Sequence, residues 1–197
     1  MNLEDSKLNL IENKLEILLK EGRLKHSYRV AECAKKLAKV YGYDEDVAYL
    51  AGLTHDAGKC LSDTQIKDYI SKYEIYLDSM EDGNRALSHS VIGSYIVKYE
   101  FEIDDEDVIN SVRYHTTGRE NMSLLEKLIY LADLIEEGRD FSDDLPRLRE
   151  LAYSGKLNEA MLLSFNNTLI NVIEKNREIH PRSVRARNYI LRELERK

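Results

Sequence analysis

Apolar side chains recur along most of the chain at the three- and four-residue spacing of a helix face. Clear stripes run through residues 8–18, 30–41 and 125–132. This spacing is typical of amphipathic α-helices, and no stretch alternates convincingly as a strand would. Glycine occurs only 9 times and proline twice, too rarely for the frequent turns of an all-β chain. We therefore expect an all-α fold: a compact bundle of about eight to ten helices, without significant β-sheet.

Residues that break or cap helices stand between these stripes. Gly22 and Gly42 are expected to end the first two helices. Ser123, with Glu126 three residues later, is the pattern of a capping box and predicts a helix start. Two further helices are expected toward the C-terminus, with Pro181 between them: residues 157–176 and 183–195.

Charge and length narrow the class of protein. The formal net charge of −7 argues against nucleic acid as a partner, although residues 177–197 carry seven basic and three acidic side chains, a net of +4. No stretch has the length of a membrane span, and the N-terminus lacks the apolar core of a signal peptide. The two cysteines, Cys33 and Cys60, form no disulfide framework. We expect a single-domain cytoplasmic protein.

Five residues that normally avoid a helix's apolar face stand on one here. Each lies three, four, seven or eight residues from apolar members of a stripe: His26, His55, His89, His115 and Asp133. Asp56, beside His55, is a sixth candidate. A single inward histidine is more often a hydrogen-bonded core residue than a metal ligand. Burying several titratable groups together is costly, however, unless they pair or bind metal ions.

The residue types indicate which metals would suit this set. Imidazole and carboxylate without thiolate disfavour structural zinc and favour iron, manganese or a catalytic divalent ion. Six ligands are more than one catalytic metal needs, because such a metal keeps open positions. Two metal ions that share a bridging aspartate would use all six, and paired metals suit phosphoester chemistry.

His26, then His55-Asp56, then Asp133, in this order on a helical chain, resembles the HD-domain phosphohydrolase superfamily. Three longer segments resemble the YqeK family within it: LAGLTHDAGK at 50–59, SVRYHTTGRENMSLLEKLIYLADLIEEGRDF at 111–141, and IHPRSVRARNY near the C-terminus. The resemblance covers residues from about 18 to 189. It implies one HD domain over residues 1–197, with a metal core at about 18–141 and a C-terminal helical extension at about 142–197.

The resemblance also implies an activity. Members of the family are described as symmetrical hydrolases that cut diadenosine tetraphosphate into two ADP with a metal-bound hydroxide as nucleophile. It implies one metal held by His26, His55, Asp56 and Asp133. A second would be held by His89 and His115, with Asp56 bridging. Iron is the first choice of metal, with manganese or another divalent ion as alternatives.

Several polar residues near these motifs are candidates for substrate contact. Lys59 lies one helical turn after His55 and, with Asp56, is assigned a catalytic role. The residues expected to bind phosphate are Lys59, Thr116, Arg139, His180 and Arg185. Each could instead be a capping, paired or solvent-facing residue. Glu136-Glu137-Gly138 stands where the family commonly has a proline, and we expect this difference to change a turn rather than the chemistry.

Other functions compete with this one. A mononuclear HD nucleotidase or deoxynucleotide phosphohydrolase would need only His26, His55, Asp56 and Asp133, so the inward placement of His89 and His115 argues against it. A di-iron oxygenase is a remote third enzyme. A non-catalytic nucleotide sensor is the alternative of a different class. We expect a small nucleotide as ligand, no nucleic acid or membrane partner, and a monomer or homodimer.

Overall fold

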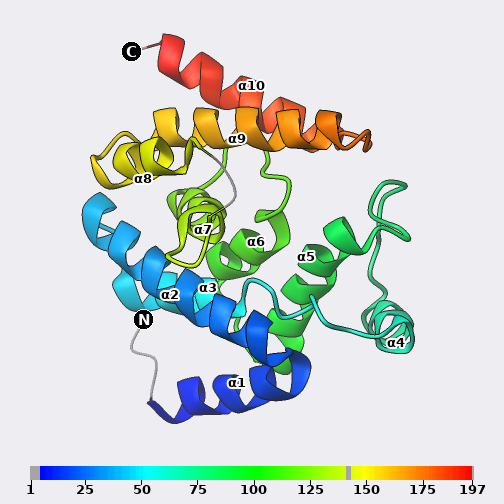
Figure 1. The fold of residues 1–197 in the computed structure, drawn as a ribbon. Coiled ribbons are helices and arrows are strands. Elements are labelled where there is room, and N and C mark those ends of the chain that lie inside the picture. The colour runs from blue at the N-terminus through cyan, green and yellow to red at the C-terminus, as the bar shows by residue number, and fades with distance from the viewer. Residues whose placement is uncertain (1–4, 141–142, 197) are drawn as a thin grey trace.

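The computed structural model describes residues 5–140 and 143–196, and within these ranges every regular element is a helix and no strand is present (Figure 1). The all-α prediction is therefore confirmed, and the bundle has ten α-helices in the described part of the chain. They are α1 (Asp5–Leu18), α2 (Glu21–Tyr41), α3 (Glu45–Thr54), α4 (Asp63–Tyr73), α5 (Arg85–Tyr95), α6 (Glu106–Tyr114), α7 (Leu124–Ile135), α8 (Leu145–Tyr153), α9 (Leu157–Glu174) and α10 (Pro181–Glu195). A short π-helix, η1 (Ile96–Glu100), continues α5.

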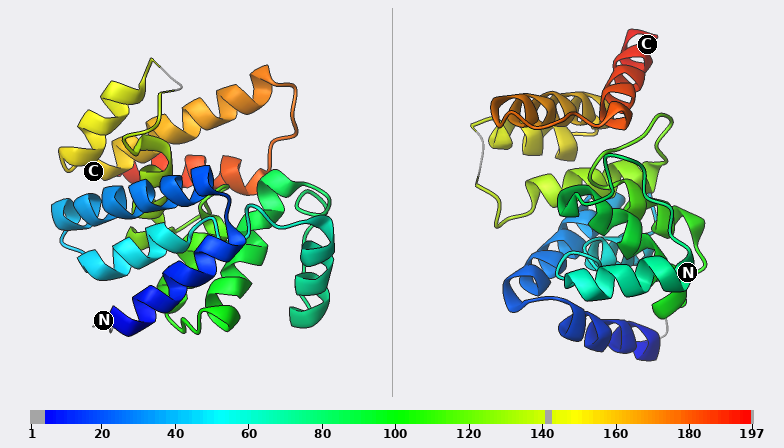
Figure 2. Two further views of the ribbon diagram at one scale, coloured as in Figure 1. Left: turned by 60° about the horizontal axis from the view of Figure 1, so that its bottom comes forward. Right: turned by 90° about the vertical axis from the view of Figure 1, so that its right-hand side faces the viewer.

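The core lies among helices that are distant in sequence. α2 packs along α3, α7 packs on α2, α3 and α6, and α6 also packs on α5. Leu37, Leu50, Ile92 and Leu128 from four of these helices are fully buried. Figures 1 and 2 show α8, α9 and α10 gathered on one side of this core, where α9 packs on α7, α8 and α10. α4 lies at the periphery beside α5.

Most of the predicted helix boundaries are confirmed. Gly42 ends α2, and the predicted capping box forms at the start of α7: the Ser123 hydroxyl accepts from the Glu126 N–H, while the Glu126 carboxylate accepts from the Ser123 N–H. The expectation for Gly22 is wrong, because α1 already ends at Leu18 and Gly22 lies in the first turn of α2. Backbone N–H groups in a first turn have no intrahelical acceptor, so an exposed glycine there disturbs little.

The C-terminal part differs from the expectation in two ways. The sequence pattern did not predict α8, which has Pro146 in its first turn. Pro181 is the first residue of α10 rather than a separator before it, and His180 is the N-cap. Proline suits both positions because it has no N–H and its φ is already helical. Among the residues described, no helix combines the length and apolar character that crossing a membrane requires.

Candidate metal centre

The six predicted ligands come from five separate helices and meet inside the core. His26 lies on α2, His89 on α5 and Asp133 on α7, whereas His55 and His115 directly follow the last residues of α3 and α6. Asp56 follows His55 in the turn after α3. All six side chains are buried except that of Asp133, which is 21% exposed. Sequence periodicity indicated that these residues face inward, and the structure brings them together.

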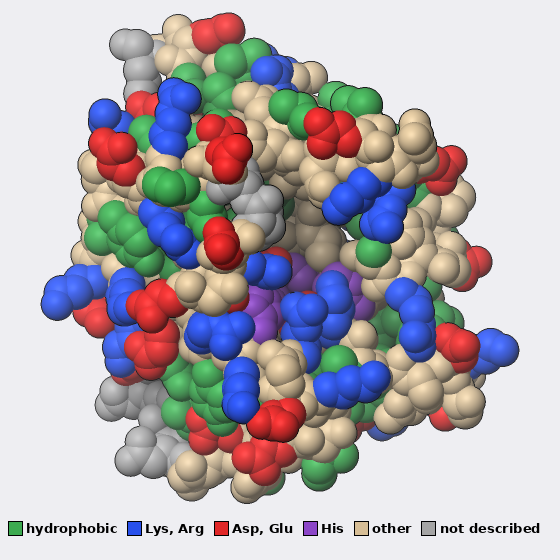
Figure 3. All heavy atoms as spheres, viewed as in Figure 1, with side chains coloured by type: hydrophobic (Ala, Val, Ile, Leu, Met, Phe, Trp, Pro, Cys, Tyr) green, Lys and Arg blue, Asp and Glu red, His purple; other side chains and the backbone are tan. Residues whose placement is uncertain are grey.

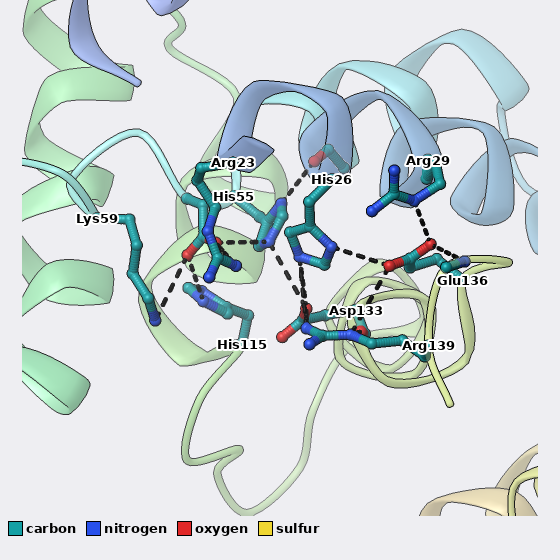
Figure 4. Close-up of polar contacts among 12 residues, drawn as sticks. Arg23, His26, Arg29, His55, Lys59, His115, Asp133, Glu136 and Arg139 are labelled. Atoms are coloured by element: carbon teal, nitrogen blue, oxygen red, sulfur yellow. Dashed lines mark hydrogen bonds and ion pairs between the residues drawn. The ribbon is translucent and has the colours of Figure 1, made fainter. Parts of the chain in front are cut away.

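The four histidines all turn the same ring nitrogen toward the cluster. Nδ1 of each ring contacts an oxygen outside the cluster, and Nε2 is directed into it. Figure 4 shows the rings of His26, His55 and His115. The Nδ1 partners of His55, His115 and His89 are the carbonyl oxygens of Gly52, Val112 and Arg85, and that of His26 is the Glu136 carboxylate. An N–H at Nδ1 leaves the Nε2 lone pair available to a metal ion.

One half of the cluster surrounds Asp133. Nε2 of His26 lies 2.9 Å from Asp133 Oδ1, and Nε2 of His55 lies 3.9 Å from the same oxygen. Although burial raises it, the histidines beside it lower the pKa of Asp133 far below the usual range. The carboxylate is therefore ionised and suited to bind a cation.

The other half surrounds Asp56. Its Oδ1 lies 3.1 Å from Nε2 of His89 and 3.6 Å from Nε2 of His115, while Oδ2 lies 3.4 Å from Nε2 of His55. Burial opposes its charge, yet the three histidines hold the pKa of Asp56 well below its usual value. Burial lowers the pKa of His89 to about 4, which keeps this ring neutral near pH 7, as a metal ligand must be.

Two buried atoms in this cluster have no hydrogen-bond partner: Nε2 of His55 and Oδ1 of Asp56. Leaving such a polar atom unsatisfied costs about 1–3 kcal/mol, so both atoms call for a ligand. Three overlapping groups of donors at this centre lie close enough to hold an ion: His26–His55–Asp56, Asp56–His89–His115 and His55–His115–Asp133, of which the first two are considered as a pair. These two groups share only Asp56 and together contain the four histidines, so the residues fit two metal ions.

Three cationic side chains border the cluster, each partly open to solvent. Arg23 Nη1 lies 2.8 Å from Asp56 Oδ2, Arg139 Nη2 lies 2.5 Å from Asp133 Oδ1, and Lys59 Nζ lies 3.1 Å from His89 Nε2. Their side chains are 31%, 30% and 31% exposed in this order. Figure 3 shows histidines at the base of a hollow with Lys and Arg side chains around it. The border of the centre is therefore suited to a polyanion.

The predicted phosphate contacts divide into two sets. Lys59 and Arg139 lie at the cluster, and Thr116 follows His115, with its hydroxyl 3.1 Å from that of Ser90. His180 and Arg185 belong to α10 and lie outside the cluster.

His180 has partners of its own. Its Nε2 lies 3.1 Å from Asp78 Oδ2, and its Nδ1 accepts from the Arg182 N–H. The Arg182 side chain reaches back toward the metal centre, with Nη1 at 3.5 Å from the Thr117 hydroxyl. Arg185 is exposed on α10. The contacts of His180 are therefore with Asp78 and the backbone of Arg182, and none of them is with a candidate metal ligand.

Sequence reasoning missed Arg23 and Glu136. Arg23 stands three residues before His26, so helix spacing could have placed it on the same face. Glu136 was expected only to alter a turn; it caps α7, and its buried carboxylate also contacts His26 Nδ1 at 3.1 Å and accepts from Arg29 Nε at 2.6 Å. Burial opposes its ionisation, but the bonds from Arg29, the Gly138 N–H and His26 lower the pKa of Glu136.

A glycine allows the turn after α3, which carries Asp56, to approach α5, which carries His89. Gly58, in the turn after α3, packs on α5 so closely that a Cβ there would overlap the carbonyl oxygen of His89 and lie 3.0 Å from the Gly93 nitrogen. Both neighbours are backbone atoms, which cannot turn aside. The absence of a side chain at position 58 therefore brings Asp56 within reach of His89.

The chain is similar to several known proteins. Residues 23–138 match the model of the HD domain. Two relatives are named "Bis(5'-nucleosyl)-tetraphosphatase, symmetrical". The one from Halalkalibacterium halodurans is 39% identical, over 89% of this chain and 92% of that protein. The one from Bacillus subtilis is 35% identical, over 88% of this chain and 91% of that protein. The crystal structure of a "predicted HD superfamily hydrolase involved in NAD metabolism" from Clostridium acetobutylicum is 41% identical and has a TM-score of 0.88 over 96% of this chain and 98% of that one.

Proposed function

From the premise that this chain belongs to the HD domain family, and within it to the symmetrical bis(5'-nucleosyl)-tetraphosphatases, we propose that it hydrolyses dinucleoside tetraphosphates at their centre. Diadenosine tetraphosphate and one water would give two ADP. The protein is an enzyme, an HD hydrolase. Its substrate and the way in which it cleaves that substrate are the proposal.

The single observation that carries the proposal is the pair of donor groups that share Asp56, with unsatisfied atoms on His55 and Asp56 themselves. His26, His55, Asp56 and Asp133 would hold one metal ion. His89 and His115 would hold the other, with Asp56 common to both. Two metal ions at such a site would lower the pKa of water to give a hydroxide nucleophile and neutralise phosphoryl oxygens.

The bordering cations would bind and orient the tetraphosphate. Arg23, Lys59 and Arg139 lie around the cluster and are partly exposed, so phosphate oxygens can reach them. Arginine suits this task because its planar guanidinium can bind two phosphate oxygens at once. Because Asp56 and Asp133 are also the proposed metal ligands, Arg23 and Arg139 would exchange a carboxylate oxygen for a phosphate oxygen in the loaded enzyme.

The reaction breaks one bond. The oxygen of water forms a bond to one of the two inner phosphorus atoms, and the bond from that phosphorus to the central bridging oxygen breaks. This oxygen leaves with the second ADP, and negative charge grows on it. Lys59 lies 3.1 Å from His89 Nε2 and 3.9 Å from Asp56 Oδ1 and would stabilise that charge.

The experiment is incubation of the purified protein with diadenosine tetraphosphate and either Fe²⁺ or Mn²⁺, with separation of the products by chromatography. ADP as the only nucleotide product supports the proposal. AMP together with ATP would mean that a different bond breaks. The matched control is Asp56→Asn, which keeps the size of the side chain and removes the shared carboxylate, and we expect it to be inactive.

The close approach of His89 and His115 to Asp56 favours this function over a mononuclear nucleotidase, and the complete donor set favours an enzyme over a sensor. We propose iron as the metal, since imidazole and carboxylate suit it, with manganese as the alternative. Four further statements stay predictions: that residues 1–197 form one domain, that the protein is a monomer or homodimer, that it is cytoplasmic, and that substrate is contacted by Thr116, His180 and Arg185.

A further inference from the structure

Among the four histidines of the cluster, His26 alone has a carboxylate as the partner of its Nδ1. His55 and His115 directly follow helices, where carbonyl oxygens are left without intrahelical donors and can accept from Nδ1. His89, inside α5, uses the carbonyl oxygen of Arg85 four residues earlier, whereas the Nδ1 of His26, inside α2, has a side-chain partner instead. This nitrogen of His26 is 3.1 Å from Glu136 Oε1, on the residue that follows α7.

Glu136 is held in place from several directions. Its side chain is 1% exposed, and Oε2 accepts from Arg29 Nε at 2.6 Å and from the Gly138 N–H at 2.5 Å. Its backbone is fixed by Arg149 of α8, which donates to the carbonyl oxygens of Ile135 and Glu136 at 2.9 and 2.8 Å. The carboxylate therefore has a fixed position with respect to the His26 ring.

Gly138 completes this arrangement. A Cβ at this residue would lie 2.6 Å from Arg29 Nε and 2.8 Å from Arg29 Cζ. The guanidinium lies against the backbone of Gly138, and a side chain there would make this flexible group shift. Any larger residue would displace Arg29 from Glu136 while leaving the contact between Glu136 and His26 possible.

We infer that Glu136 is a positioning residue: it holds the His26 ring with Nε2 directed at Asp133 and so sets the metal affinity of the position that these two residues share. This inference rests on the proposed metal centre. A carboxylate that accepts from Nδ1–H fixes the tautomer, orients the ring and makes the opposite nitrogen a stronger ligand. Nε2 of His26 already lies 2.9 Å from Asp133 Oδ1. The position held by His89 and His115 has no contact with Glu136 among the described residues.

The test is calorimetric titration of the metal-free protein with Mn²⁺ alone, for the unchanged chain and two variants. Glu136→Gln keeps an acceptor but loses the charge, and Glu136→Met is of similar size without a comparable acceptor. Removing such a partner lowers metal affinity by about 10–100-fold, and we expect the Met variant near the upper end. Only one of two binding events should weaken, because the second metal position does not use His26.

Two further variants separate positioning from mere stability. Glu137→Gln is the matched control, since the neighbouring carboxylate is exposed and pairs with Lys36, and it should leave both binding events unchanged. Gly138→Ala should displace Arg29 and give a loss smaller than that of Glu136→Met. Histidine ¹⁵N NMR of the metal-free protein gives an independent signature: a protonated Nδ1 on His26 that Glu136→Met loses.

The inference is overturned if Glu136→Met is folded by circular dichroism yet binds Mn²⁺ as the unchanged protein does. Equal weakening of both binding events in the variant, with an unaltered His26 tautomer, would indicate a purely structural role and would also overturn the inference. The inference fails too if the protein without substitutions takes up no Mn²⁺. The titration contains no nucleotide. Normal Mn²⁺ binding without tetraphosphate cleavage would therefore count against the proposed function alone.

Discussion

Oδ1 of Asp56 lies 3.1 Å from Nε2 of His89, which joins the turn after α3 to the middle of α5 across 33 residues of sequence. This oxygen has no hydrogen-bond partner, although it is buried. The pair marks the second of the two proposed metal positions. It also distinguishes a two-metal centre from a mononuclear one, because the mononuclear ligand set does not include His89.

Removing His89 should therefore cost one metal ion and spare the other. We expect His89→Ala to retain about one Mn²⁺ per chain where the unchanged protein takes about two, because His26, His55 and Asp133 remain. Elemental analysis after gel filtration measures this. The control is Ser88→Ala, a neighbouring buried side chain outside the donor groups. Equal metal content in His89→Ala and the unchanged protein would contradict the assignment.

Arg23 should matter both for substrate binding and for the stability of the metal-free fold. A hydrogen bond to a charged group contributes about 1.5–3 kcal/mol, so Arg23→Met should lower kcat/KM for diadenosine tetraphosphate by about 10–100-fold. Arg23→Lys should lose less, because it keeps the charge. Without metal, Arg23→Met should also lower the melting temperature, since Asp56 loses its 2.8 Å partner. Unaltered steady-state kinetics in Arg23→Met would show that this side chain does not bind substrate.

A side chain at position 58 should separate the turn after α3 from α5. We expect Gly58→Ala to destabilise the protein by about 1–3 kcal/mol, the usual effect of an overpacked core, because the new Cβ meets backbone atoms of His89 and Gly93. Urea unfolding measures it. Gly22→Ala is the control: nothing lies within 4 Å of its added Cβ and the residue is in the first turn of α2, so alanine should leave the stability nearly unchanged or raise it slightly. Equal stability of the two variants would contradict the packing described.

The two thiols should be separable by their reactivity. Burial raises the pKa of Cys33 to about 11, and its sulfur lies 3.3 Å from the Tyr153 hydroxyl. Alkylation requires the thiolate, so the rate at Cys33 should keep rising with pH up to about 11, whereas an ordinary thiol levels off above about pH 8.5. Iodoacetamide labelling of Cys60→Ser, followed by mass spectrometry, isolates Cys33. The same variant in urea should label as an ordinary thiol, and similar rates in both states would contradict the prediction.

Periodicity predicted the helical fold and the inward placement of five of the six candidate ligands for one physical reason; Asp56 was added as the neighbour of His55. A histidine or aspartate that shares a helix face with Val30, Ala51 or Ile129 must be buried with them, and the spacing within a single helix is enough to predict this burial. That these residues converge is a property of how five helices pack. From the sequence, only the family resemblance indicated that these residues converge, and the structure then brought them together.

The parts that sequence reasoning missed depend on contacts between distant elements. Glu136 reaches back 110 residues to His26, and nothing in the spacing near Glu136 indicates this partner. His180 matches a family segment, but its local role is to cap α10 and pair with Asp78. The apolar pattern did not predict α8, which has Pro146 in its first turn, where a helix accommodates proline.

The most direct test of the account is a titration of the metal-free protein with Mn²⁺ during turnover of diadenosine tetraphosphate, with products and rate recorded at each addition. The account predicts ADP as the sole nucleotide product and a rate that reaches its full value only at about two Mn²⁺ per chain. Full turnover at about one Mn²⁺ per chain, or the appearance of AMP with ATP, would contradict it.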